Sequence, residues 1–275
     1  MKRFPVVSSQ ALGPQIGRLV VVAPRPARFG RPGQFVIVRV DDLGERIPLT
    51  ICDTDRGRET ITLVVQAVGA TTERMIGLRA GDQLMDVVGP LGRPTDLERV
   101  GVVAVVAGGV GAAIALPVAR ALREVGNRVV GVLGARSRDH VILEDEFREA
   151  ADHLLVATDD GSYGRDGFVT DALADLLVEE PVALVHAVGP IPMMHAVADL
   201  TRGAGVPTVV SLNPIMVDGT GMCGGCRVSI AGETRFACVD GPEFDAHLVD
   251  FDLLALRNRA YLSHERRALE ALHHG

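Results

Sequence analysis

Aromatic side chains are scarce in this chain: it has no tryptophan, two tyrosines and eight phenylalanines among 275 residues. Surfaces that stack nucleobases are built from aromatic rings, so few such surfaces can form. Basic residues are also outnumbered, because the net charge is −7 and no segment is densely basic. Nucleic-acid-binding domains usually carry a basic face. These two shortages argue against nucleic acid as the main partner.

Cysteine is scarce as well, and three of the four cysteines lie within sixteen residues. A secreted chain of this size would more often spread paired cysteines as disulfides. The clustering indicates a metal site and a reducing, cytoplasmic environment. Lys2 and Arg3 near the start are followed by Ser8 and Gly13 rather than by an apolar run. We therefore expect no signal peptide.

Charge is missing from the twenty residues Val100–Ala119, which meets the length criterion for a membrane span. Gly108–Gly111 divides this run into an apolar segment and a small-residue segment, and Pro117 interrupts the second one. Buried strand–turn–helix units are also uniformly apolar. We expect such a unit here and no membrane span.

Three regions differ in pattern and predict a β-barrel followed by an α/β domain. Residues 1–97 contain short runs rich in Val, Ile and Thr, separated by Gly and Pro, which is typical of a small antiparallel barrel. Residues 98–212 alternate strands and helices, which predicts a doubly wound parallel sheet. Residues 213–275 are first rich in Gly and Cys and then predict a helical tail over Leu253–Ala271.

The expected elements follow from these patterns. Strands are predicted at Leu19–Val22, Phe35–Val40, Thr60–Val68, Val102–Val106, Val129–Leu133, Leu154–Ala157, Ala183–Val188 and Thr208–Leu212, and helices at Ala112–Glu124, Leu143–Ala151, Val169–Val178 and Pro192–Arg202.

The clustered cysteines have the spacing of an iron–sulfur loop. Asp218 is followed after four residues by Cys223, after two more by Cys226, and after eleven more by Cys238. Ferredoxin-type [2Fe–2S] loops space their ligands four, then two, then far apart, with Cys at the first position. Glycines between the ligands allow a backbone to wrap closely around a cluster. The motif predicts a [2Fe–2S] cluster held by the three cysteines, with Asp218 as the fourth ligand.

Other uses of the cysteines stay open at this stage. A zinc ribbon needs a second C-x2-C pair, which the chain lacks, although zinc with three Cys and one Asp is chemically feasible. A thioredoxin-like C-x2-C pair would need neither Cys238 nor Asp218. The fourth cluster ligand could also be another oxygen donor.

A glycine turn follows the first strand of the α/β region, at Gly108, Gly109, Val110 and Gly111. Such a turn places a pyrophosphate on the N–H groups at the start of the next helix. Three more turns follow later strands, and the carboxyl ends of parallel strands collect ligands at one edge. The residues that we assign to this cofactor site in the later turns are Arg136, Asp159, Gly161, Gly189 and Pro190. Arg136 or Arg138 could pair with a ribose 2′-phosphate, or could simply be solvated.

Taken together, these parts resemble the ferredoxin–NADP reductase superfamily, a flavin-binding barrel followed by a nicotinamide-binding α/β domain. Residues 213–223 (NPIMVDGTGMC) and 236–244 (FACVDGPEF) are similar to the small subunit of NADH-dependent ferredoxin–NADP oxidoreductase, also called sulfide dehydrogenase. The electron-transfer subunit of dihydroorotate dehydrogenase is a related match. The Asp in place of Cys belongs to the first resemblance, because the second implies four Cys ligands.

The resemblance implies an FAD site in the barrel. It assigns flavin contacts to Arg46, Ile47, Pro48, Leu49 and Thr50, and it places Thr50 near flavin N5, where hydride transfer occurs. The superfamily usually has Arg three residues before this Thr, where Ile47 stands here. It further implies that Val64, Val65 and Gln66 line the flavin, and that Gly69, Thr71 and Thr72 hold the FAD phosphates.

The resemblance also implies the activity. It describes an electron-transfer subunit that exchanges electrons between NAD(P)H and FAD and passes them singly through the [2Fe–2S] cluster. The implied partner is a larger flavin and iron–sulfur subunit with a glutamate-synthase-like fold, and ferredoxin is reached indirectly, with electron bifurcation as one use. Alternatives are a dihydroorotate dehydrogenase subunit or a module of a hydrogenase or reductase assembly.

Overall fold

A computed structural model describes residues 4–274, so the basic residues Lys2 and Arg3 lie outside the described part. Contacts divide the chain into two compact units. The first comprises the described chain up to Arg93, then Pro214–Asp240, then the chain from Asp250 onward; the second comprises Pro94–Asn213 and Gly241–Val249. The division at residues 97 and 212 stays a prediction about domains. By contacts, the region 213–275 is shared between the two units.

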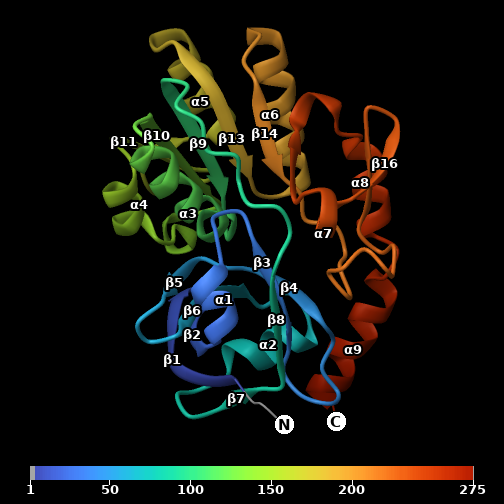
Figure 1. Cartoon of the computed structure of the whole chain (residues 1–275). Helices are drawn as coiled ribbons and strands as arrows, with labels where there is room; N and C mark the ends of the chain where they lie inside the picture. The colour runs from blue at the N-terminus through green and yellow to red at the C-terminus, as the bar shows by residue number, and fades with distance from the viewer. Residues whose placement is uncertain (1–3, 275) are drawn as a thin grey trace. The chain divides into compact units, whose positions relative to one another are not determined.

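The N-terminal part of the first unit is built from antiparallel strands, which confirms the predicted barrel (Figure 1). One sheet has the order β5-β6-β2-β1-β7 and the other has the order β4-β3-β8. The strands and helices of this part are β1 (Phe4–Gly13), β2 (Ile16–Val22), α1 (Pro24–Phe29), β3 (Phe35–Arg39), β4 (Ile47–Thr50), β5 (Asp53–Asp55), β6 (Thr60–Gln66), α2 (Ala70–Ile76), β7 (Gln83–Leu84) and β8 (Asp86–Leu91).

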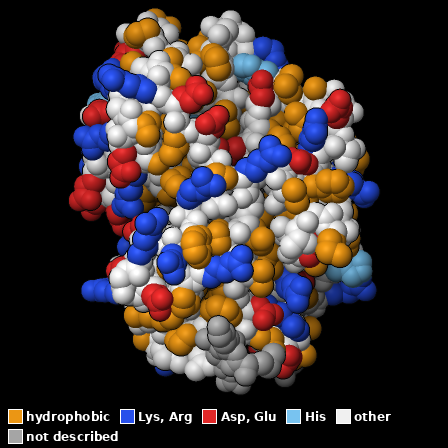
Figure 2. All heavy atoms as spheres, viewed as in Figure 1, with side chains coloured by type: hydrophobic (Ala, Val, Ile, Leu, Met, Phe, Trp, Pro, Cys, Tyr) orange, Lys and Arg blue, Asp and Glu red, His pale blue; other side chains and the backbone are white. Residues whose placement is uncertain are grey.

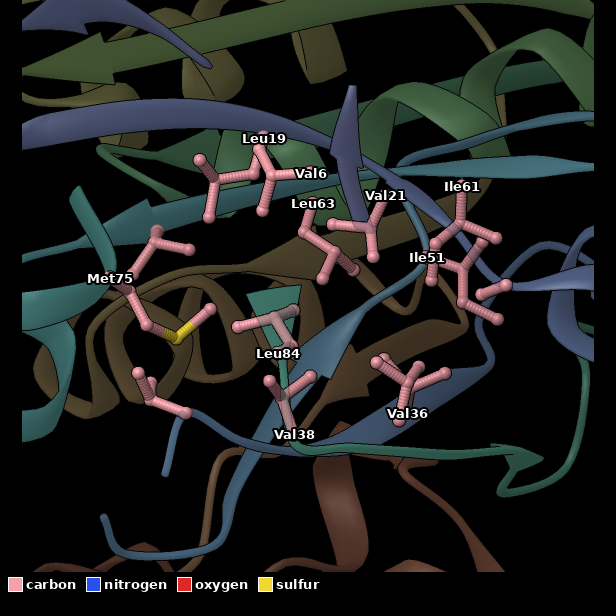
Figure 3. Close-up of a cluster of buried hydrophobic side chains, with 14 of the residues drawn as sticks. Val6, Leu19, Val21, Val36, Val38, Ile51, Ile61, Leu63, Met75 and Leu84 are labelled. Carbon is pink, nitrogen blue, oxygen red and sulfur yellow. The ribbon is translucent and has the colours of Figure 1, made fainter. Parts of the chain in front are cut away.

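Aliphatic side chains from both sheets fill the interior of the barrel, because alternate residues of a strand point to the same face. Leu19, Ile61 and Leu63 are fully buried there, and Met75 of α2 closes one side (Figure 3). Val65 belongs to the same core. The barrel is therefore held by a continuous hydrophobic core.

The second unit contains the predicted parallel sheet, in the order β12-β11-β10-β9-β13-β14-β17. Helices α3 and α4 pack side by side, as do α5 and α6. The elements are β9 (Val102–Gly108), α3 (Gly111–Glu124), β10 (Arg128–Ala135), the 3₁₀ turn η1 (Arg138–His140), α4 (Glu144–Ala150), β11 (His153–Thr158), β12 (Arg165–Asp166), α5 (Val169–Glu179), β13 (Val182–Val188), α6 (Ile191–Ala204), β14 (Thr208–Ser211), β17 (Glu243–Asp245) and η2 (Ala246–Leu248).

The uncharged run Val100–Ala119 forms β9, the glycine turn and the first half of α3, as expected. Within residues 4–274, no helix has both the length and the apolar character needed to cross a membrane. The last strand, β17, was not expected, and it pairs antiparallel with β14. It lies beyond the cysteine-rich segment in sequence, so the strand–helix alternation gave no sign of it.

The remaining elements of the first unit are the hairpin β15 (Arg227–Ile230) and β16 (Glu233–Phe236), then α7 (Ala237–Asp240), α8 (Phe251–Asn258) and α9 (Leu262–His274). The helical tail predicted over Leu253–Ala271 is present, but it is divided into α8 and α9 by the non-helical residues 259–261. Tight backbone bonds end α8, with the N–H of Arg259 donating to Leu256 O (3.2 Å) and that of Ala260 to Arg257 O (3.1 Å). No Gly or Pro marks this break in the sequence.

The surface is mixed in charge. On the face drawn in Figure 2, acidic, basic and hydrophobic side chains are interspersed.

Candidate functional site: a cysteine loop, a glycine edge and a barrel strand

The predicted cluster ligands lie within residues 214–240, which we call the cysteine loop. Asp218, Cys223 and Cys226 precede the β15–β16 hairpin, and Cys238 lies in α7 just after it. Cys226 and Cys238 are buried, and their Sγ atoms lie 3.2 Å apart. Cys223 is exposed, and its Sγ accepts the N–H of Gly225 at 3.4 Å. All three are free thiols. A disulfide has its sulfurs about 2.05 Å apart, so the Cys226–Cys238 contact is a thiol pair that a shared inorganic group could join.

Asp218 organises the turn before the first cysteine. Its Oδ1 accepts the N–H of Thr220 and its Oδ2 accepts the N–H of Cys223, both at 2.7 Å. The hydrogen bond from Thr220, joined by that from Cys223, lowers the pKa of the Asp218 carboxyl, so it is ionised at neutral pH. A carboxylate has about four acceptor positions. The two backbone bonds therefore leave Asp218 able to bind iron as well.

Burial, together with the neighbouring thiol of Cys226, raises the pKa of Cys238 to about 12. Cysteine binds metals as the thiolate, so loading this loop with iron must release protons. Within residues 4–274, no three His, Cys, Asp or Glu side chains gather tightly enough to hold one metal ion. Ligands of a two-iron cluster surround a larger group than a single ion, and so lie further apart. Three thiols and one ionised carboxylate on one loop fit a [2Fe–2S] group.

Glycine allows the loop to turn where it does. Gly219, Gly221 and Gly224 have φ values of +74°, +85° and +66°, in the region that residues with a side chain rarely adopt. Gly219 also packs tightly on the barrel, because a Cβ there would lie 2.6 Å from Leu91 Cδ1 and 2.8 Å from Ile37 Cγ1. The cysteine loop and the barrel are thus packed together within the first unit.

The predicted nucleotide turns meet at one edge of the parallel sheet. β9 pairs with β10 on one side and with β13 on the other, so the strand order reverses beside β9, and ligands bind at such a point. A Cβ on Gly108 would lie 2.5 Å from Met193 Sδ, and one on Gly111 would lie 2.4 Å from Val188 O. The turn Gly108–Gly111 and the turn Gly189–Pro190 are therefore packed against each other at this edge.

The turns after β10 and β11 are also joined. The N–H of Asp159 donates to Ala135 O (3.0 Å) and that of Asp160 donates to Arg136 O (3.2 Å). Arg136 and Asp159 are both exposed, and Gly161 has φ +67°. Arg138 lies over the ring of Tyr163, with its guanidinium carbon 5.3 Å from the ring centre. The sequence did not mark Tyr163, because it is a single aromatic residue in a loop.

The residues assigned to flavin lie on two barrel strands and one helix. β4 pairs with β3, and its residues Ile47, Pro48, Leu49 and Thr50 are half-buried, whereas Arg46 just before it is exposed. Val64 and Val65 on β6 are buried and Gln66 is half-buried.

The two threonines at α2 are already engaged within the barrel. Thr72 Oγ1 accepts the N–H of Gly69 (3.0 Å) and of Val68 (2.9 Å), and Thr71 Oγ1 accepts the N–H of Glu45 (3.2 Å). Their hydroxyls therefore hold the backbone of this turn in place.

Comparison with known proteins agrees with this arrangement. Residues 213–250 match the iron–sulfur cluster binding domain of dihydroorotate dehydrogenase B, and residues 105–199 match the oxidoreductase NAD-binding domain. A Thermotoga maritima protein named as a homologue of the electron transfer subunit of dihydroorotate dehydrogenase B (NAD(+)) is 50% identical over 90% of this chain and 88% of its own. The subunit of that name from Shouchella clausii is 35% identical over 88% of this chain and 95% of its own.

The chain belongs to the family of dihydroorotate dehydrogenase B electron transfer subunits and their homologues. A solved structure of NADH-dependent reduced ferredoxin-NADP oxidoreductase, studied for flavin-based electron bifurcation, contains a chain similar to this member of the family. The two share 45% sequence identity over 98% of each chain, with a TM-score of 0.93. The resemblance drawn from the sequence motifs is thus confirmed, together with the barrel and α/β fold. The iron–sulfur match covers the loop that carries Asp218 and the three cysteines.

Proposed function

We propose that this chain is the electron-transfer subunit of an NAD(P)H oxidoreductase, with sites for FAD, a nicotinamide nucleotide and a [2Fe–2S] cluster. The observation that carries the proposal is the cysteine loop, whose buried Cys226 and Cys238 thiols lie 3.2 Å apart beside the Asp218 turn. FAD supplies two-electron exchange with the nicotinamide, and the cluster supplies one-electron transfer. The protein supplies binding, orientation and electrostatics.

The residues of the chain divide this work. Cys223, Cys226, Cys238 and the ionised Asp218 carboxylate hold the cluster, and the glycines at φ values above zero let the backbone N–H groups turn toward it. Thr50 on β4 orients the reacting end of the flavin. Gly69, Thr71 and Thr72 shape the turn for the FAD phosphates, with the two hydroxyls fixing its backbone.

The nucleotide is held by the sheet edge in the second unit. Gly111 begins α3, where backbone N–H groups donate hydrogen bonds to a pyrophosphate. Gly108 and Gly189 keep the turns clear of side chains, so the nicotinamide can approach the backbone. Arg136 and Asp159 stand at the joined turns for the ribose. NADH and NADPH both remain candidates, because these turns carry both signs of charge.

We infer a larger partner subunit, since the relatives are named electron transfer subunits. The resemblance of residues 213–223 and 236–244 supports a flavin and iron–sulfur partner with a glutamate-synthase-like fold, acting on ferredoxin in a bifurcating reaction. The clustered free cysteines support a cytoplasmic location. The names of the relatives favour the dihydroorotate dehydrogenase alternative. Asp218 favours a subunit of NADH-dependent ferredoxin–NADP oxidoreductase.

The test begins with the chain purified without oxygen, by its visible spectrum, its released flavin and its iron and sulfide content. Titration with NADH, and separately with NADPH, then follows bleaching of the flavin. We expect two irons and one FAD per chain and bleaching by one of the nucleotides. Cys226→Ser is the matched variant, which should lose iron and keep flavin. A colourless protein that carries zinc would overturn the proposal.

The partner is tested separately by recovering the tagged chain from its own cells. We expect a second, larger subunit that carries flavin and iron–sulfur. Recovery of the chain alone as a fully active reductase would contradict the subunit reading. Activity with dihydroorotate in the recovered complex would select the dihydroorotate dehydrogenase alternative. Activity with NADPH and ferredoxin would select the NADH-dependent ferredoxin–NADP oxidoreductase.

A further inference from the structure

Arg257 of helix α8 reaches the cysteine loop. Its Nη2 donates a hydrogen bond to the carbonyl oxygen of Gly225, at 3.4 Å. Gly225 lies between Cys223 and Cys226, and its own N–H donates to Cys223 Sγ. Arg257, thirty-one positions beyond Cys226 in sequence, therefore contacts the backbone that joins Cys223 to Cys226.

The guanidinium of Arg257 is incompletely paired. Its Nε is buried and meets no acceptor in the described part of the chain. Arg235, another arginine of the same unit, has instead a carboxylate of Glu233 at 2.6 Å. Burying a cation without an anionic partner is unfavourable. The loop that Arg257 contacts at Gly225 O becomes anionic when it holds a cluster, because its cysteines then bind as thiolates and Asp218 is ionised.

We propose that Arg257 is a positioning residue for the cluster. The positive charge of Arg257 stabilises the reduced cluster and raises the midpoint potential of the cluster. This proposal rests on the function proposed above. One-electron reduction adds one negative charge to the cluster, and a nearby cation lowers the free energy of that charge. Solvent ions screen a half-buried cation less than an exposed one. A raised potential makes transfer of a single electron from the flavin to the cluster more favourable.

The experiment is an EPR-monitored titration with dithionite of the whole chain and three variants. Arg257→Gln removes the charge and can still donate a hydrogen bond, and Arg257→Lys keeps the charge. Arg259→Gln is the matched control, because Arg259 is exposed and lies two residues further along the same helix end. Iron content and flavin content are measured for each variant.

We expect Arg257→Gln to lower the equilibrium constant for reduction of the cluster about tenfold, which is about 59 mV for a one-electron couple. Arg257→Lys and Arg259→Gln should stay within about twofold of the wild type. Equal potentials for the wild type and Arg257→Gln, at equal iron content, would overturn the proposal. Equal losses in Arg257→Gln and Arg257→Lys would overturn it too, since they would indicate a purely structural contact.

If Arg257→Gln does not retain iron, the Lys variant decides the question. A potential within about twofold of the wild type supports a role for the charge, and a tenfold fall contradicts it. A wild-type chain without any cluster would refute the proposed function itself. If the wild-type chain holds a cluster and its potential does not change when the charge at position 257 is removed, only the role of Arg257 is refuted.

Discussion

His186 Nε2 lies 3.0 Å from Glu243 Oε1 in the interior of the second unit. His186 is on β13, the strand next to the central strand β9, and is 1% exposed, and Glu243 is on β17, the strand that follows the cysteine loop. The hydroxyl of Thr95 donates to the same oxygen at 2.7 Å. One carboxylate thus ties the segment that leads into β9 and the returning strand β17 to the middle of the sheet. Nothing in the spacing of these three residues predicts the contact.

Replacing this carboxylate should destabilise the second unit. We expect Glu243→Gln to lower the free energy of unfolding by about 1–3 kcal/mol, because hydrogen bonds to a charged carboxylate are replaced by bonds to a neutral amide in a buried place. Urea denaturation measures the change. Glu124→Gln, at the exposed end of α3, is the control and should stay within about 0.5 kcal/mol. An equal effect of the two variants would contradict this prediction.

The same carboxylate should make the stability depend on pH. Burial by itself raises the pKa of Glu243, but the charge and hydrogen bond of His186, with the bond from Thr95, outweigh it and leave the pKa lowered. A lowered carboxyl pKa stabilises the fold above the unfolded value of about 4.3, and this stabilisation is lost as the pH falls through the folded value. We expect the wild type to lose more stability below about pH 4.3 than Glu243→Gln. Parallel curves of urea midpoint against pH would refute this.

Asp218→Cys tests the fourth cluster ligand. The ligand set changes from mixed to all-thiolate, so we expect the cluster to be kept and its potential and EPR spectrum to change. Asp218→Asn is the companion variant, because it retains an oxygen that can accept the N–H of Thr220. An unchanged spectrum and potential in Asp218→Cys would show that Asp218 shapes the turn without binding iron.

Thr50→Val tests the flavin assignment on β4. Valine has nearly the shape of threonine but no hydroxyl, so we expect weaker or altered flavin binding at normal iron content. Flavin release and iron analysis on the same sample give the comparison. Thr54→Val on β5, which belongs to the other sheet of the barrel, is the control and should leave both cofactors in place. Equal loss of flavin and iron in Thr50→Val would indicate misfolding instead.

Gly111→Ala tests the nucleotide turn. The new Cβ would lie 2.4 Å from Val188 O, so the backbone of one turn must move. Such overpacking costs about 1–3 kcal/mol, and we expect weaker binding of the nucleotide at unchanged iron content. Gly203→Ala in α6 is the control, since a Cβ there meets nothing within 4 Å and alanine favours a helix by about 1 kcal/mol. Unchanged nucleotide affinity in Gly111→Ala would contradict the assignment.

Much of the architecture could be predicted because it depends on local pattern. Apolar runs of the length of strands, followed by small-residue helices, mark a parallel sheet whichever partners the strands take. The strands and helices predicted for residues 98–212 match their counterparts from β9 to β14 to within about two residues, and the two-residue strand β12 is the only strand in this range that was not predicted. The cysteine spacing is equally local. Ligands that are close in sequence can surround one cluster only if the short chain between them turns tightly, so their spacing is restricted.

Local pattern alone determined the strand–helix alternation and the glycine turns, and it predicts which residues bind the cluster. Only the tertiary structure placed Arg257 against Gly225, closed the loop on the barrel at Gly219, and joined His186 to Glu243. It also added β17 to the sheet of the second unit and divided the C-terminal helical tail into α8 and α9. These contacts join residues far apart in sequence, and no periodicity encodes them, because packing of the whole chain selects which distant side chains meet.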